Sequence, residues 1–382
     1  MTVFVAGVGM HPFGRHDASA TEMGVHAVRA ALRDAGTDRF EAAFCGTAYG
    51  GVASGHRVLG ALGLTGGPIV DIEAGCASGA AAFSLAAGAI AAGQYGTVLV
   101  YGVEKMPQGI IRSSFFAPWQ EAAGFSPAPA YFALRAQQLM GQSSATKDDL
   151  AAVVVKNRRH GAANPDAMYQ SCVTAEQVLA SRVVCEPLHL WMLCSPNEGA
   201  AAMVLSSRPS SGPSSRPGGG TAAVRLRAAE LRSHLPGYVL NEGTPMCGLT
   251  GADPPTPSRL AADAAYARAG VGPDDLDVVE CQDTDAAREL LAYEELRLCP
   301  PGGSAALLCS GATAIGGRLP VNPSGGLLSK GEPLGASALG QAVELVRQLR
   351  GEAGARQVEG ARVALAHTVG RGANASAVIL SR

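Results

Sequence analysis

One order of secondary-structure signals occurs twice in this chain of 382 residues, and it limits the fold more than any other feature. In the first half, the helical spacing of Val25–Ala35 stops at a glycine and precedes the short apolar run Ala42–Cys45. In the second half, Leu260–Ala269 also stops at a glycine and precedes Leu276–Cys281. Self-similarity of this kind indicates repeated structural units. We therefore expect two equivalent α/β halves.

Each half continues with a turn, a helix and a strand. In the first half, a helix of small residues over Cys76–Ala92 precedes the apolar strand Val98–Val103. The turn and helix of Asn322–Leu349 and the strand Val363–His367 take the same places in the second half. Short apolar runs that alternate with helical patterns are typical of a buried sheet covered by helices.

Two stretches interrupt this order. The segment 105–198 loses the regular alternation and predicts an inserted loop domain. The run Ser206–Gly220 reads SSRPSSGPSSRPGGG and cannot bury a core, so it predicts a flexible connection. The expected organisation is an N-terminal half at 1–104 and 199–205, a loop domain at 105–198, a linker at 206–222 and a C-terminal half at 223–382.

The composition excludes several classes of partner. The net charge is −2 and no basic run occurs, so nucleic acid is not expected. Nine cysteines at irregular spacings, with no zinc-type pair and no signal-peptide pattern, favour a reducing cytoplasm and no metal site. No apolar stretch reaches the roughly 18–20 residues of a membrane span, so no membrane association is expected.

Cys76 is the residue best placed to act as a nucleophile. It follows a predicted strand and begins a predicted helix, where unpaired N–H groups and the helix dipole stabilise a thiolate. A thiolate can attack an acyl thioester, and the same N–H groups can hold the resulting oxyanion. If the two halves pack about a pseudo-twofold axis, the equivalent helices begin at one cleft, which brings Cys76 and Glu332 together. The alternative is a buried structural cysteine.

Five segments spread over nearly the whole chain resemble the thiolase superfamily, in particular the sterol carrier protein branch of thiolases. The resemblance implies a thiolase fold, which is a duplicated αβαβα five-layer α/β architecture with a loop domain. It also implies a homodimer, an acyl-CoA or acyl carrier protein thioester as substrate, no tightly bound cofactor and, in some relatives, a small OB-fold partner protein. The segments are Glu73–Gly79, Lys156–Arg159, Cys194–Ala201, Glu289–Glu294 and Val321–Ala336.

Four motifs carry the chemistry of the family, and this chain matches them unevenly. The nucleophile matches Cys76, but the family's Gly-His-Pro turn reads Gly331-Glu332-Pro333, without the histidine. The His-Asp-Cys-Phe turn reads Gln282-Asp283-Thr284-Asp285, without the acid/base cysteine. The His-Asn-x-Gly turn is retained in part at His367–Gly370, and the resemblance implies that the N–H of Gly370 completes the oxyanion hole.

These departures change the expected chemistry. A carboxylate beside the cysteine opposes thiolate formation unless it is protonated, so standard thiolysis is not expected. Glu332 is a candidate general base, assisted by Asp283, Asp285 or His367, and the alternative is an inert residue in a relic site. His56 follows a glycine-rich stretch and is a candidate auxiliary base or a solvated surface histidine.

Three functions fit these residues. The first is an acyltransferase of specialised metabolism that loads Cys76 and passes the acyl group to a carbon, oxygen or nitrogen acceptor. The second is a retro-aldol lyase in which Glu332 or Asp283 deprotonates the β-hydroxyl of a CoA thioester, with no nucleophile required. The third is a non-catalytic subunit that keeps the fold for assembly.

Overall fold

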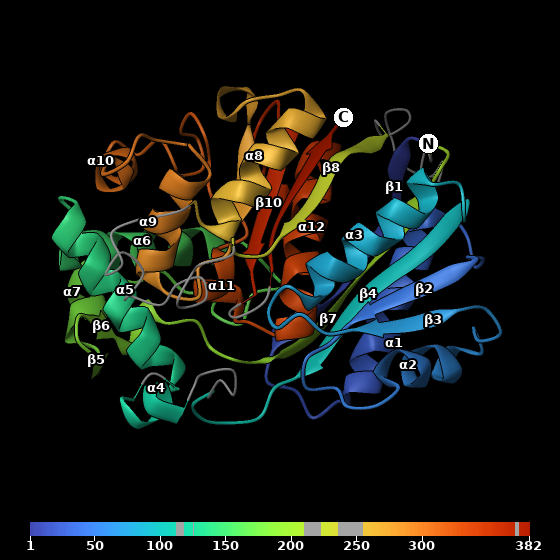
Figure 1. The fold of residues 1–382 in the computed structure, drawn as a ribbon, viewed down its shortest axis with the longest axis horizontal. Helices are drawn as coiled ribbons and strands as arrows, with labels where there is room; N and C mark the ends of the chain where they lie inside the picture. Colours follow the sequence, from blue (N-terminus) through green and yellow to red (C-terminus); the bar gives the residue numbers. More distant parts are fainter. Residues whose placement is uncertain (112–117, 125, 210–222, 236–254, 371–373) are drawn as a thin grey trace.

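The computed structural model describes residues 1–111, 118–124, 126–209, 223–235, 255–370 and 374–382. Within these ranges, nine strands form one mixed sheet in the order β3-β2-β4-β7-β1-β8-β11-β10-β9 (Figure 1). The N-terminal half contributes β1 (Val3–Gly14), α1 (Ala20–Ala35), β2 (Ala42–Gly46), α2 (Ser54–Leu62), β3 (Ile69–Ile72), α3 (Ser78–Ala91), β4 (Thr97–Lys105) and β7 (Glu198–Ser206).

In the sheet, the N-terminal half has the strand order β3-β2-β4-β7-β1. The C-terminal half has the equivalent strands in the reverse order, β8-β11-β10-β9, which confirms the duplication. The two halves join where β1 pairs with β8, with Val3 opposite Leu226. Val321 forms a parallel bridge to Val279 of β9 and so takes the place that β3 has beside β2. The elements of this half are β8 (Val224–Arg232), α8 (Pro257–Ala269), β9 (Val278–Cys281), α9 (Ala286–Glu295), α10 (Ser304–Cys309), α11 (Gly326–Lys330), α12 (Leu334–Arg350), β10 (Val363–Val369) and β11 (Ala375–Ser381).

The side chains of each strand alternate between an outer and a central helix layer. In β4, Leu99 packs with α1 and α2, whereas Val98 faces the cluster of α3 and α12. In β10, Leu365 packs with α8 and α9, whereas Ala364 faces the same central cluster. Helices α3 and α12 therefore lie between the two halves of the sheet. The predicted five-layer arrangement is confirmed.

Small residues let α12 approach the sheet closely. A side-chain carbon added at Gly102 of β4 would lie 2.1 Å from the carbonyl oxygen of Gly335, in the first turn of α12. Only glycine fits at such a close approach of two backbones. This contact sets the position at which α12 begins, and hence where Glu332 lies.

The segment expected to form a loop domain gathers at one side of the molecule, beside α9, α10 and α11 (Figure 1). It contains α4 (Pro118–Ala122), α5 (Ala128–Gln142), α6 (Lys147–Gly161), α7 (Ala175–Ala180), β5 (Val183–Cys185) and β6 (Leu188–His189).

Two further sequence predictions concern the linker and a membrane span. Most of the expected linker, 210–222, lies outside the described residues. No helix in the described part of the chain is both long and apolar enough to span a membrane.

Candidate active site

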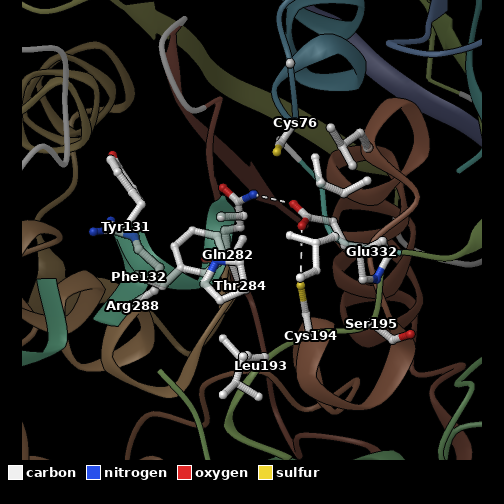
Figure 2. A pocket seen from close by; sticks show the side chains of 18 of the residues that line it. Cys76, Tyr131, Phe132, Leu193, Cys194, Ser195, Gln282, Thr284, Arg288 and Glu332 are labelled. Atoms are coloured by element: carbon white, nitrogen blue, oxygen red, sulfur yellow. Dashed lines mark hydrogen bonds between the residues drawn. The ribbon is translucent and has the colours of Figure 1, made fainter. Parts of the chain in front are cut away.

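A cavity of about 800 Å³ contains both Cys76 and Glu332 in its wall. The wall combines the chain ahead of α3 and α12, the ends of β9 and β10, the start of α9 and part of the inserted segment. Figure 2 shows Cys76 facing the pair formed by Gln282 and Glu332. Small-molecule sites in proteins commonly have this volume.

Cys76 lies in the turn between β3 and α3. The helix begins at Ser78 with Ala77 as its N-cap, so the cysteine precedes the first turn in which it was expected. Gly75 has a φ of 58°, a conformation that favours glycine. The Ser78 hydroxyl accepts a hydrogen bond from the Ala74 N–H (2.9 Å) and donates to the Gly75 carbonyl (2.6 Å). This turn holds the half-buried thiol at the cavity wall.

Glu332 directly precedes the N-cap of α12. Its N–H donates to the Ser195 carbonyl (2.9 Å), which anchors the turn to the end of the inserted segment. One carboxylate oxygen accepts from Nε2 of Gln282 (2.7 Å), and the other accepts from the thiol of Cys194 (3.4 Å; Figure 2). The residue is only 5% exposed. The carboxylate is therefore held in place by donors on both oxygens.

The amide of Gln282 has a fixed orientation. Its Oε1 accepts a hydrogen bond from the Val369 N–H, so Nε2 must be the atom that faces Glu332. The main-chain N–H of Gln282 donates to the His367 carbonyl (3.0 Å). One hydrogen of Nε2 goes to Glu332, and the other has no acceptor among the described residues. That second N–H is available to a ligand oxygen in the cavity.

Cys194 belongs to the site, although it was not among the candidates chosen from the sequence. Burial, and next the negative charge of Glu332, raise the pKa of the Cys194 thiol well above its usual range. Cys194 is therefore a thiol that donates to the carboxylate. Its only sequence signal was its place in the family-like segment Cys194–Ala201.

The two aspartates expected to assist Glu332 do not line the cavity. Asp283 is fully buried and accepts from the N–H groups of Leu327 (2.6 Å) and Leu328 (3.2 Å) at the start of α11. Asp285 is the N-cap of α9 and accepts from the Arg288 N–H (2.9 Å). Both carboxylates satisfy helix N-termini, which explains their presence without a catalytic role.

The two candidate histidines are also absent from the cavity wall. His56 is exposed on α2, so the solvated alternative describes it better. His367 is completely buried in β10, and burial lowers the pKa of its imidazole to about 3. Its ring nitrogens make no hydrogen bond to any described residue. A neutral, enclosed imidazole cannot exchange protons with a ligand in the cavity.

Gly370 differs from its expected role as an oxyanion donor. Its N–H donates to the Asn374 carbonyl (2.8 Å) and is therefore engaged within the β10–β11 connection. A side-chain carbon at this position would lie 2.4 Å from the Ala74 carbonyl oxygen. The glycine thus lets β10 pack against the turn that carries Cys76. The second Nε2 hydrogen of Gln282, in contrast, has no acceptor among the described residues.

The inserted segment supplies the remaining wall of the cavity. Aromatic side chains and arginines make up much of it, and sequence reasoning assigned none of them to the site, although Arg158 lies in the family-like segment Lys156–Arg159. No group of three His, Cys, Asp or Glu side chains in the described ranges could hold a metal ion. The wall residues from this segment include Tyr131, Phe132, Arg135, Arg158, Tyr169 and Trp191.

The duplicated five-layer fold, with a cysteine ahead of one central helix and a polar residue ahead of the other, defines a protein of the thiolase type. Comparisons with known families agree. The family described as "Thiolase, N-terminal domain" matches residues 3–208, and "Thiolase C-terminal domain-like" matches residues 253–382. The chain therefore belongs to the thiolase family.

Comparisons with individual proteins show that the chain is similar to the sterol carrier protein thiolases. The chain is 36% identical to sterol carrier protein 2 of Bos taurus, over 97% of this chain and 70% of that protein. It is 35% identical to the benzoylsuccinyl-CoA thiolase subunit BbsB of Thauera aromatica, over 98% and 96% of the two chains. The solved structure "Ltp2-ChsH2(DUF35) aldolase" has a TM-score of 0.84 and 25% identity, and the match covers 100% of this chain and 97% of that one.

Proposed function

We propose that this protein is an acyltransferase that carries an acyl group as a thioester on Cys76, with Glu332 as general base and Gln282 as oxyanion donor. The observation that carries the proposal is the shared cavity, in which Cys76 faces a hydrogen-bonded Gln282–Glu332 pair (Figure 2). A buried carboxylate replaces the histidine of the family as the proton acceptor.

In the first half-reaction, Glu332 takes the proton of the Cys76 thiol, and the sulfur attacks the carbonyl carbon of an acyl-CoA or acyl carrier thioester. The second Nε2 hydrogen of Gln282 stabilises the oxyanion. The intermediate expels the donor thiolate, which recovers the proton from Glu332. The products are the acyl-Cys76 thioester and the free donor thiol.

In the second half-reaction, Glu332 takes a proton from the acceptor, which is a carbon acid or an O–H or N–H group. The acceptor attacks the acyl carbon, and Cys76 leaves as a thiolate that takes the proton from Glu332. A new C–C, C–O or C–N bond replaces the thioester, and the enzyme returns to its starting state.

The test is intact-protein mass spectrometry after incubation with acyl-CoA donors. We expect an acyl adduct that disappears in Cys76→Ala and persists in Cys172→Ala, which removes an exposed free cysteine. If no short or medium donor leaves an adduct on Cys76, the proposal is wrong.

A retro-aldol lyase is the second candidate, favoured by the similarity to a solved aldolase. Glu332 would take the proton of a β-hydroxyl, the Cα–Cβ bond would break, and the enolate held by Gln282 would take that proton back at Cα. Cys76 would have no covalent role. Full lyase activity in Cys76→Ala, together with loss in Glu332→Gln, selects this reaction over acyl transfer.

We also propose that the protein works as a homodimer in the cytoplasm and that a small OB-fold protein completes its assembly. The name of the similar aldolase structure includes a DUF35 protein, and BbsB is named as a subunit. Both names support a partner protein for this chain. All cysteines in the described ranges are free, which supports a reducing compartment. If a reconstituted complex keeps full activity without Cys76 and Glu332, the chain is instead a non-catalytic subunit.

A further inference from the structure

Arg158 is a buried cation in the wall of the cavity. It lies near the end of α6, is only 7% exposed, and stacks over the ring of Tyr169 with its guanidinium carbon 3.9 Å from the ring centre. Its Nε is buried without a hydrogen-bond acceptor, and no carboxylate of the described residues pairs with the guanidinium. Tyr169 covers the flat face of the group, and no described residue accepts a hydrogen bond from its edge.

The other arginines of the cavity wall differ from Arg158. Arg288 forms an ion pair with Glu295. Arg135 lies close enough to Asp285 for its charge to oppose the rise that burial causes in the pKa of that carboxyl. Arg182 is exposed, so water can solvate it. Arg158 has no counter-ion among the described residues and little contact with solvent, and burial lowers its pKa without removing its charge.

An unpaired buried charge is costly, and a ligand in the cavity can supply the missing anion. A guanidinium edge matches a planar carboxylate through two parallel hydrogen bonds. The aromatic side chains Tyr131 and Phe132 in the same wall suit the apolar body of an acyl chain.

We infer that the cavity takes an acyl thioester whose acyl chain carries a carboxylate, and that Arg158 binds this carboxylate while the thioester lies at Cys76. The inference rests on the proposed acyl transfer and adds a substrate class to it. The phosphates of CoA offer a similar anionic chemistry, but these strongly hydrated groups fit a solvated arginine such as Arg182 better than an enclosed one.

The experiment compares donors that differ only at the end of the acyl chain. Succinyl, glutaryl and adipyl thioesters are each paired with a counterpart in which an isopropyl group replaces the carboxylate. Each is prepared both on CoA and on N-acetylcysteamine, which has no phosphate. Acylation of Cys76 is measured in the wild type, in Arg158→Gln and in Arg159→Gln. Arg159 is the neighbouring, exposed arginine outside the cavity wall, so its variant is the matched control.

We expect at least one carboxylate-bearing chain to react roughly 10- to 100-fold faster than its counterpart, as a charge-assisted hydrogen bond predicts, on both carriers. Arg158→Gln should remove this preference, and Arg159→Gln should keep it. If Cys76 is acylated at the same rate by the carboxylate-bearing chains and by their counterparts, the inference is wrong and the proposed acyl transfer stands. If Arg158→Gln weakens all CoA thioesters equally and leaves the phosphate-free ones unchanged, Arg158 binds phosphate and the inference is wrong.

Binding provides a readout that does not depend on acylation. In Cys76→Ala protein, calorimetry should give a dissociation constant for the preferred N-acetylcysteamine thioester that rises roughly 10- to 100-fold when Arg158→Gln is added. Preferred binding without any adduct in the wild type would refute the acyl transfer and keep the anion site. Equal binding of both chain ends would refute the anion site.

Discussion

Replacement of Glu332 by glutamine tests the proposed base while the shape of the site stays the same. The new side chain can keep a carbonyl oxygen toward Nε2 of Gln282, now 2.7 Å from the carboxylate, and turn its NH₂ group toward the Cys194 sulfur. We therefore expect the free energy of unfolding to change by about 1 kcal/mol or less. General-base catalysis contributes roughly 10²–10⁴-fold, so acylation of Cys76 should slow by that factor, or about 2.7–5.4 kcal/mol in activation free energy.

The assay is single-turnover acylation, stopped with acid and followed by intact mass, with urea unfolding to verify stability. Glu359→Gln makes the same change at an exposed carboxylate and should react like the wild type. A folded Glu332→Gln protein that acylates within about threefold of the wild-type rate would refute the role of Glu332 as base.

Three further variants separate chemistry from structure. Gln282→Leu removes the oxyanion donor and should lower the acylation rate by roughly 10²–10³-fold in the same single-turnover assay, and a normal rate would contradict this role. Asp283→Ala leaves buried N–H groups at the start of α11 without an acceptor, and should lower the urea unfolding free energy by about 3 kcal/mol while the folded fraction acylates normally. Burial lowers the pKa of His367 to about 3. Below pH 6.5 the unfolded chain therefore binds a proton that the folded protein does not, so the wild-type protein loses stability as the pH falls. Relative to the wild type, His367→Leu should therefore gain about 2 kcal/mol between pH 7 and pH 5, and a pH-independent difference would show that the imidazole titrates normally.

Much of the fold followed from local patterns. Helix α1 was predicted from spacing and ends at Ala35, with Gly36 as its left-handed cap, and β2 has the expected bounds within one residue. The loop wall of the cavity was not predictable in this way. Arg158 and Tyr169 lie 11 positions apart on either side of the end of α6, and their stacking depends on how the chain turns back after that helix.

The amino-acid order alone was enough to establish the duplicated α/β halves and to put Cys76 and Glu332 at equivalent helix starts, because hydrophobic periodicity and helix termini are local properties. The fold had to be known before Gln282 and Cys194 could be joined to Glu332, from which they are 50 and 138 positions distant in the chain. The fold was also needed to show that His367 is buried in the core and that the N–H of Gly370 is hydrogen-bonded within a turn. Burial and hydrogen-bond geometry depend on which distant segments meet, and that information is not carried by spacing.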